Sequence, residues 1–567
     1  MGRSLDSFGA PVVSLVRTRR SLRSTTVPRP GGAGEKEGVL RGRRRTMVGG
    51  GDPGACAMGL AGAAGTGAAA GGAAAVAAAV VRCSSPRPAP TSATPSGTAD
   101  GFRPAYHYSP RSGNLADPDG LVLYEGEYHL FHQQDGTWAH AVSPDMVHWR
   151  ALDTALGHDA LGLAMSGSCV VDGADTSGLV PGGGMVAVYT STEGGEAQSL
   201  AYSTDRGRTW ERFAHNPVIA NDGRTDFRDP KVFWHEPSRA WVMVVCAGDH
   251  VEFHRSTDLL GWERAGDFGQ GAGSHAAVWE CPDLFPLTDA VTGETRWILT
   301  VSIGANGETG GSSAQYFVGD FDGSAFFPED TAIRFTDAGQ DFYAAQSFEH
   351  VEGRRVWLGW MSNWNYPYGL PTGDWHGEMS VPRELSLTSR DGGRVLLQNP
   401  VPELDALRGR AIDLSGTGVT DSTTDLGSGR VVDLDLVLDI SGAEDVWLTL
   451  AAGRVDGRDQ EVRVGVSSAA GVLYLDRTAG GVRTVQTEDG GTADFALRRE
   501  TAYRPAGGRV HLHVLLDRSS LEVFVDDGAP AGTFLVLNDP DAQGIGLGAR
   551  GSATILSGTL TPLVSAW

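Results

Sequence analysis

From residue 101 onward, short apolar runs alternate with turns rich in Gly, Asp and Pro. The runs over 121–124, 186–189 and 241–245 have the length and the β-branched and aromatic content of buried strands. No segment of this region repeats its apolar residues with the 3.6-residue period of a long helix. The pattern therefore predicts an all-β protein.

A unit of strand, turn and aromatic residue recurs in the first half of this region. It ends at Trp149, Trp210 and Trp262, with a looser copy ending at Phe326, and these residues lie 61, 52 and 64 positions apart. Ser and Asp side chains in such turns bond the turn backbone, while the aromatic ring packs between neighbouring sheets. The period fits one four-stranded propeller blade, so residues 101–400 are predicted to form a five-bladed β-propeller. A looser β-sandwich is the second choice.

The pattern changes after residue 400. Segments such as 432–439 and 510–517 alternate apolar and polar residues, as strands do when one face is buried and the other is wet. We therefore expect a C-terminal β-sandwich over 430–567, with 401–429 as a linker and the start of the sandwich. This second domain shows no acidic constellation of its own, so its expected role is to stabilise the first.

The first hundred residues have a different composition. Arg41 and the three arginines at 43–45 precede an uncharged Ala/Gly-rich stretch over 57–81, and a Ser/Pro/Thr-rich segment follows over 84–98. This order is typical of an export signal, and the arginine cluster with low hydrophobicity favours the twin-arginine route. A transmembrane anchor is the alternative, although Ala and Gly contribute little apolar surface. We predict that 1–100 is an export signal and disordered linker, and that the mature protein is secreted without a stable membrane span.

Length and charge narrow the function further. The 567 residues suffice for two folded domains and a tail, and the net charge is −23. Residues 1–100 hold 13 Lys+Arg against 5 Asp+Glu, while the remainder hold 33 against 64. A body this acidic repels phosphate backbones, so we expect no nucleic-acid partner and favour a neutral substrate.

The cysteines give no sign of a metal site. None of the five has metal-ligand spacing or forms a CxxC pair, and the last three fall in strand-like apolar runs, which favours buried free thiols. His and carboxylate residues do not gather in metal spacing, and no Gly-rich loop has a phosphate-binding context. We therefore predict no cofactor and no metal.

Three acidic residues stand in settings that suit sugar chemistry. Asp117 and Asp229 each precede a proline, and Glu280 follows a Trp and precedes Cys-Pro-Asp. Hydrolysis of a glycosidic bond needs one carboxylate to attack or stabilise and one carboxylic acid to protonate the leaving oxygen. Taken alone, Asp117 would pass for an ordinary turn residue and Glu280 for a buried hydrogen-bonded acid. Together the three are candidates for a glycosidase site.

At these positions the chain resembles glycoside hydrolase family 32, the group of invertases, levanases and inulinases. The resemblance covers nearly all of 101–567, and its motifs occur in the family's order. They are Ala-Asp-Pro-Asp-Gly at 116–120, Leu-Phe-His-Gln at 130–133, Trp-Ala-His-Ala-Val-Ser at 138–143, Met-Ser-Gly-Ser at 165–168, Phe-Arg-Asp-Pro-Lys-Val at 227–232, Glu-Cys-Pro-Asp-Leu-Phe at 280–285, Tyr-Ala-Ala-Gln-Ser-Phe at 343–348, Gly-Trp-Met-Ser-Asn-Trp at 359–364, Met-Ser-Val-Pro-Arg-Glu-Leu at 379–385 and Asp-Arg-Ser-Ser-Leu-Glu-Val-Phe at 517–524.

The resemblance implies a five-bladed propeller with an appended sandwich and a reaction that retains configuration. It implies that Asp117 is the nucleophile, Asp229 the transition-state stabiliser and Glu280 the acid/base. A retaining enzyme is expected to hold its two catalytic carboxyl groups roughly 5–5.5 Å apart. The expected substrate-binding residues are Gln133, Trp138, Met165, Ser166, Arg228, Tyr343 and Trp364.

The chain departs from the family pattern just before and after the expected nucleophile. The family's Trp-Met-Asn is Asn114-Leu115-Ala116 here, and its second Asn is Asp119. These changes remove a wall and a hydroxyl contact from the expected sugar pocket. The motifs at 343–348 and 359–364 resemble the levanase and exo-inulinase branch more than the sucrose-specific invertases.

The expected function is a secreted retaining hydrolase that releases fructose from levan, inulin-type fructans or sucrose. One alternative is a fructosyltransferase, in which a sugar rather than water resolves the intermediate. Another is a catalytically silent carbohydrate-binding propeller, which the altered 114–116 segment favours and the three acids disfavour. A sialidase would need an ordered trio of arginines for the substrate carboxylate, and the sequence offers none.

Overall fold

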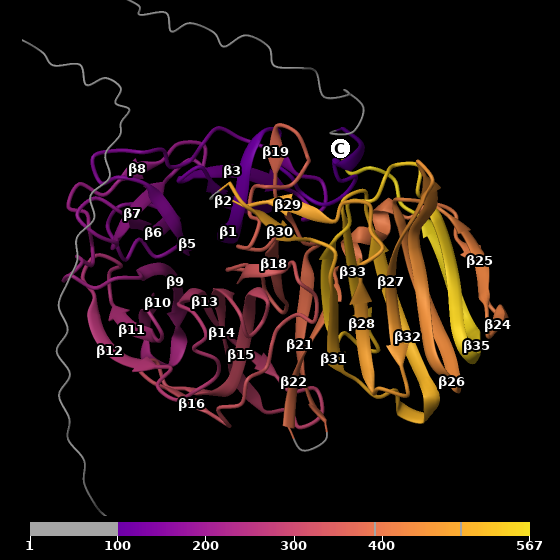
Figure 1. Ribbon diagram of the computed structural model, residues 1–567. Coiled ribbons are helices and arrows are strands. Elements are labelled where there is room, and N and C mark those ends of the chain that lie inside the picture. Colours follow the sequence, from indigo (N-terminus) through magenta and orange to yellow (C-terminus); the bar gives the residue numbers. More distant parts are fainter. Residues whose placement is uncertain (1–99, 391–392, 488–489) are drawn as a thin grey trace, which may run out of the picture. The chain divides into compact units, whose positions relative to one another are not determined.

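The computed structural model of the protein describes residues 100–390, 393–487 and 490–567 (Figure 1). The predicted export signal lies outside these residues, as do Cys56 and Cys83. Within them the chain is almost entirely β-structure. Four short 3-10 helices interrupt it: η1 (Asp100–Phe102), η2 (Glu236–Ser238), η3 (Pro402–Leu407) and η4 (Ala506–Gly508).

Five antiparallel sheets follow one another along the first part of the chain. Blade 1 contains β1 (Gly113–Tyr124), β2 (Glu127–Gln134), β3 (Thr137–Ser143), β4 (Arg150–Ala151) and, parallel to β1, β19 (Trp375–His376). Blade 2 contains β5 (Ala164–Asp172), β6 (Gly184–Ser191), β7 (Ala197–Ser203) and β8 (Glu211–Arg212). Blade 3 contains β9 (Phe227–His235), β10 (Ala240–Ala247), β11 (Val251–Ser256) and β12 (Glu263–Phe268).

The last two blades complete the ring. Blade 4 contains β13 (Trp279–Thr288), β14 (Thr295–Asn306), β15 (Gly311–Phe321) and β16 (Phe326–Pro328). Blade 5 contains β17 (Tyr343–Ser347), β18 (Arg355–Met361), β20 (Glu378–Met379), β21 (Arg383–Arg390) and β22 (Gly393–Pro400). The first strand of each blade contacts the first strand of the next, from β1 through β5, β9 and β13 to β17 and back to β1. The predicted five-bladed propeller is confirmed.

The second strands of blades 2 and 3 are buried along their whole length because the blades on either side cover both of their faces. All eight residues of β6 and all eight of β10 are buried. Their side chains form cores between neighbouring blades. Cys169, Cys246 and Cys281 lie in this interior as buried free thiols, as the sequence predicts.

The repeated turn has the predicted hydrogen bonding in three blades. Asp145 Oδ1 accepts the N–H groups of Val147 and His148 at 3.0 and 2.8 Å, and Asp205 and Asp258 do the same for the residues two to four positions after them. A serine two positions before each Asp donates its hydroxyl to the carboxylate. The carboxylate replaces backbone acceptors that the turn cannot supply.

The C-terminal region folds as the predicted β-sandwich. Its main strands are β23 (Ile412–Asp413), β24 (Gly418–Thr420), β25 (Thr423–Ser428), β26 (Val432–Val455), β27 (Arg458–Ser467), β28 (Val472–Asp476), β31 (Arg498–Ala502), β32 (Arg509–Leu516), β33 (Ser520–Val525), β34 (Ala531–Leu535) and β35 (Gly544–Pro562), with β29 (Thr484–Gln486) paired to β30 (Thr492–Asp494). The long strand β26 pairs with β35 along most of its length, with β32 through its first half and with β27 through its second half. One apolar core lies inside these strands.

A buried polar cluster links the propeller to the sandwich. Asp517 accepts the N–H of Ala105 at 2.8 Å and contacts His107 Nδ1 at 2.9 Å, while Glu522 contacts His107 Nε2 at 2.9 Å and Arg383 Nε at 2.9 Å. Burial opposes the charge on His107, but its hydrogen bonds to the two carboxylates outweigh this effect and raise the pKa of His107 to about 10. Every charge in the cluster therefore has an opposite partner.

No helix in the described part of the chain has the length and apolar content needed to cross a bilayer.

Candidate active site

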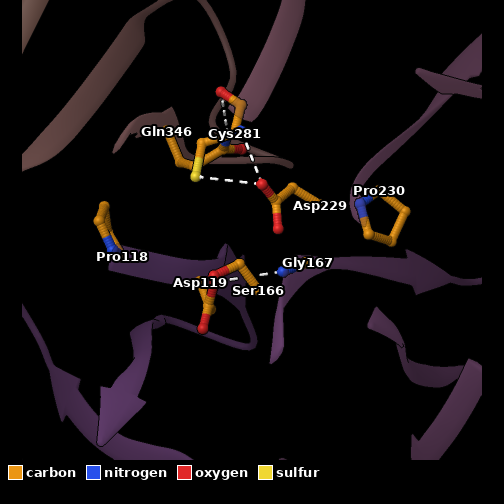
Figure 2. Close-up of a pocket in the computed structure, with 8 residues that line it drawn as sticks. All are labelled: Pro118, Asp119, Ser166, Gly167, Asp229, Pro230, Cys281 and Gln346. Carbon is orange, nitrogen blue, oxygen red and sulfur yellow. Dashed lines mark hydrogen bonds between the residues drawn. The ribbon is translucent and has the colours of Figure 1, made fainter. Parts of the chain in front are cut away.

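Each blade contributes side chains to one site from its innermost strand. The contributors are Asp117 on β1, Met165 and Ser166 on β5, Arg228 and Asp229 on β9, Glu280 on β13, and Tyr343 on β17. Figure 2 shows part of the pocket between these strands, where Ser166, Asp229 and Cys281 approach one another from three blades. The sequence-predicted acids, up to 163 positions apart in the chain, therefore meet at one place.

The innermost strands share an irregularity at the positions of these side chains. In every blade the pairing of the first strand with the second shifts register beside the site residue, between Glu280 and Asp283 in blade 4 for example. Asp229 and Cys281 adopt left-handed backbone conformations, with φ of 66° and 46°. Such bulges turn a side chain out of the regular alternation of a strand. Here they direct the acids into the pocket.

Asp117 has one committed and one unpartnered oxygen. Its Oδ2 accepts the Ser166 hydroxyl at 2.8 Å and the Cys281 thiol at 3.5 Å, whereas the buried Oδ1 has no hydrogen-bond partner. Burial, followed by the negative charge of Glu280, raises the pKa of Asp117 to about 6 against the opposing effect of the Ser166 bond. An oriented carboxylate with a free oxygen suits nucleophilic attack.

Glu280 is held from two sides. The Tyr343 hydroxyl donates a short hydrogen bond to its Oε2. Arg228 donates to its Oε1 from Nη2 at 2.8 Å and from Nε at 3.2 Å. The carboxyl group is therefore fixed in orientation beside Asp117, as a proton donor to a leaving group must be.

Asp229 lies close enough to Glu280 and Asp117 for their charges to raise its pKa. Its Oδ2 accepts the backbone N–H of Cys281 at 2.9 Å, and its own N–H donates to Thr190 Oγ1 at 3.0 Å. Burial raises the pKa of Asp229 to about 7, with Arg228 opposing the rise and Glu280 adding to it. A rigid carboxyl group of this kind can grip sugar hydroxyls.

Asp119, which stands where the related motif has Asn, is bound inside the site wall. Its Oδ2 accepts Gln133 Nε2 at 2.8 Å and its Oδ1 accepts the Gly167 N–H at 3.2 Å. Burial and the charge of Asp117 raise the pKa of Asp119 well above its ordinary value. The carboxyl group thus occupies the place of a neutral amide and orients Gln133.

The two predicted tryptophans have different positions. Trp138 is fully buried, and its indole N–H donates to the Met165 carbonyl at 2.9 Å, so it supports β5 from behind. Trp364 is half-buried and packs edge-on to Tyr343, with ring centroids 6.3 Å apart. Of the two, Trp364 is therefore the one that is partly exposed and lies beside a residue bound to Glu280.

Four further residues belong to the site that the sequence interpretation did not assign. Cys281 contacts two of the acids, as described above. Gln346 donates to the Pro282 carbonyl at 3.0 Å and lines the pocket in Figure 2. Glu196 and Asp226 bind Arg228 at 2.8 and 2.7 Å. Cys281 and Gln346 sit inside quoted motifs, whereas Glu196 and Asp226 carry no signal apart from their acidity.

Among the described residues, no group of three or more His, Cys, Asp or Glu is arranged to hold a metal ion.

Comparison with known proteins gives consistent matches over both domains. The model of the "Glycosyl hydrolases family 32 N-terminal domain" matches residues 107–400, and that of "Glycosyl hydrolases family 32 C terminal" matches residues 403–562. A levanase of Bacillus subtilis is 40% identical over 82% of this chain and 71% of its own length. An extracellular exo-inulinase of Aspergillus niger is 31% identical over 80% of this chain and 93% of its own.

A solved structure has the same fold. The crystal structure of exo-inulinase from Aspergillus awamori superposes with a TM-score of 0.74 and 31% identity, covering 82% of this chain and 99% of that one.

Proposed function

The chain belongs to glycoside hydrolase family 32 and is a glycoside hydrolase, and we propose that it releases fructose from β-fructosides by double displacement. The substrates proposed are levan, inulin-type fructans and sucrose. Levanase and exo-inulinase are the names of its relatives, and the carboxyl, hydroxyl and amide groups at the site suit hydrogen bonding to sugar hydroxyls.

The observation that carries the proposal is the pairing of an oriented carboxylate with a fixed carboxyl group in one pocket. In the first step Asp117 attacks the anomeric carbon with its unpartnered Oδ1 while Glu280 protonates the leaving oxygen. A fructosyl–Asp117 ester forms and the glycosidic bond breaks. In the second step Glu280 takes a proton from water, and the water displaces Asp117.

Asp229 is proposed to stabilise the transition state, because its bonds to ring hydroxyls strengthen as the ring flattens and gains positive charge. Gln133, Ser166, Arg228, Tyr343 and Trp364 are proposed to hold the sugar, and Met165 to shape the wall. Trp138 is proposed to act indirectly, through the Met165 carbonyl.

Side-by-side assays on levan, inulin and sucrose test the proposal. The expected product is free fructose, whereas longer or cyclic oligomers would indicate transfer to a sugar acceptor. Glu280→Gln should lower turnover at least about 100-fold, because proton donation is lost, while substrate binding persists. Glu263→Gln, the same change on the exposed outer strand β12, is the matched control and should keep full activity.

If the Glu280→Gln protein binds fructan as tightly as the parent and the parent releases no sugar, the protein is a carbohydrate-binding propeller and the proposal fails.

We further propose that the protein is exported. The exo-inulinase relatives are named extracellular, and residues 1–100 have the order of an export signal. A reporter fused to residues 1–100 should appear outside the cell and should stay inside when Arg44 and Arg45 are both replaced by Lys. Export that is unchanged by the replacement would contradict the twin-arginine route.

A further inference from the structure

The guanidinium group of Arg228 contacts three carboxyl groups. Its Nη1 donates to Glu196 at 2.8 Å and to Asp226 at 2.7 Å, while Nη2 and Nε face Glu280. One side of the guanidinium group, Nη1, therefore binds two carboxyl groups outside the proposed catalytic set, and the other side, Nη2 and Nε, binds Glu280.

Glu196 is anchored by more than its ion pair. It directly precedes β7, and its Oε2 accepts the backbone N–H of Phe227, the first residue of β9, at 2.8 Å. One carboxylate therefore fixes both the start of β9 and the guanidinium group of the next residue. Its side chain is 27% exposed, and that of Asp226 is 34% exposed, so water still reaches both carboxyl groups.

An arginine beside a proton donor creates a conflict. The cation favours the ionised form of a neighbouring carboxyl group, yet a general acid must hold its proton when substrate arrives. Two further anions on the same guanidinium reduce the positive potential that reaches Glu280.

We propose that Glu196 and Asp226 are positioning residues that bind the outer edge of Arg228 and offset its charge, so that Glu280 keeps the proton it donates. This inference rests on the proposed role of Glu280. On this proposal the two acids do not contact the substrate. They set the pH above which the activity of the enzyme falls.

Other ionisable groups also face Glu280 and contribute to its environment. They are Arg228 and Asp229 on β9, Asp117 on β1, Tyr343 on β17, Cys246 on β10 and its own neighbour Cys281. Replacing Glu196 or Asp226 leaves all of them in place. Gln at position 196 can still accept the Phe227 N–H through its amide oxygen, so Glu196→Gln removes the charge and retains the anchor.

The test is the pH profile of kcat/KM for fructose release by the parent, Glu196→Gln and Asp226→Asn proteins. In each variant the alkaline limb should move to lower pH by roughly half a unit to one unit, which lowers activity above the limb by about 3–10-fold. The acid limb should move less, because Asp117 contacts Ser166 and Cys281 rather than Arg228.

The matched control is Glu211→Gln. Glu211 lies on β8 of the same blade and accepts the Tyr202 hydroxyl, so the same charge is removed away from Arg228. Its profile should coincide with that of the parent. Thermal melts establish that each variant is folded, and Asp226→Asn tests the same claim if Glu196→Gln does not fold.

Any of three outcomes would overturn the inference. The alkaline limb does not move, the alkaline limb moves to higher pH, or activity falls equally at every pH so that the shape of the profile is unchanged. Each of these outcomes leaves the proposed hydrolysis intact, since the parent is active in all of them. A parent protein that releases no fructose would instead contradict the proposed function.

Discussion

At the scale of single residues, the pocket holds carboxyl groups that burial makes costly to ionise. Asp117 and Asp229 have pKa values of about 6 and about 7, because both are buried and lie close to other acids. Arg228 is the cation that contacts Glu280, and it is shared with two other carboxylates. The buried acids of the site therefore repel one another when they are ionised. A stable core would avoid such repulsion, but functional sites often contain it.

This repulsion predicts a stability gain when Asp117 is neutralised. A carboxyl group whose pKa is raised from 3.8 to about 6 contributes stability below pH 3.8 that is lost as the pH rises through 6. Asp117→Asn should therefore raise the free energy of unfolding at pH 8 by about 1–3 kcal/mol, and the gain should shrink as the pH falls towards 4. Thermal melts across this range measure it. Asp153→Asn, at an exposed position, should show no pH-dependent gain.

The hydrogen bond from Ser166 leads to a second prediction about Asp117. Its hydroxyl lowers the pKa of Asp117 by stabilising the carboxylate, so its removal should raise that pKa. In Ser166→Ala the acid limb of the kcat/KM profile should move up by about half a unit. Exposed Ser112→Ala is the control. An acid limb that stays in place would show that Asp117 does not set it.

The sequence predicted the acids but not their surroundings. Asp117, Asp229 and Glu280 could be found because each lies in a distinct motif beside a proline or cysteine. Trp138 was expected at the sugar, yet it is fully buried, since a sequence does not show which of two aromatic residues reaches a pocket. Glu196 was not identified because its role depends on a contact with β9, from another blade.

At the scale of elements, each blade combines a regular outer part with an irregular first strand. The repeated Ser/Asp turns are local, and their hydrogen bonds join residues two to four positions apart. They could therefore be predicted from spacing. The bulges beside Glu280 and Asp229 depend on pairing with a second strand, and no local pattern reveals such a register shift.

The repeated turn gives a test at this scale. Asp258 accepts the N–H groups of Leu260 and Gly261, both at 2.9 Å, and the Ser256 hydroxyl. Asp258→Ala should lower the free energy of unfolding by about 1–2 kcal/mol, because two backbone donors lose their acceptor. Urea unfolding measures the change. Asp258→Asn keeps an acceptor oxygen and should recover most of it, and equal losses in both variants would contradict this account.

At the scale of the whole molecule, the sandwich is tied to the propeller by buried ions. His107 and Asp517 are 410 positions apart, and Asp517 also accepts backbone N–H groups of Ala105 and Tyr106. The two domains were predictable from their different periodicities, but this link was not, because it joins distant residues without a local pattern. In the sequence, the 517–524 motif indicates the second domain but not its contact with His107.

The link predicts that the domains unfold together. Asp517→Ala leaves buried His107 without one of its anions and should cost about 3 kcal/mol or more. Calorimetry should show one transition in the parent protein and a lower or divided transition in the variant. Asp459→Ala, which removes an exposed ion pair with Arg454, should change stability by less than about 1 kcal/mol. Equal effects of the two changes would rule out a special role for the link.

In the proposed mechanism Asp117 forms a covalent bond to the sugar, and this ester can be trapped. Glu280→Ala slows hydrolysis of the intermediate, so an activated fructosyl fluoride should load the enzyme faster than water releases it. Peptide mass spectrometry should then find one fructosyl group on the peptide that contains Asp117, and none when Asp117→Asn is added. A fructosyl group on any other residue, or turnover with inverted configuration and no adduct, would contradict the account.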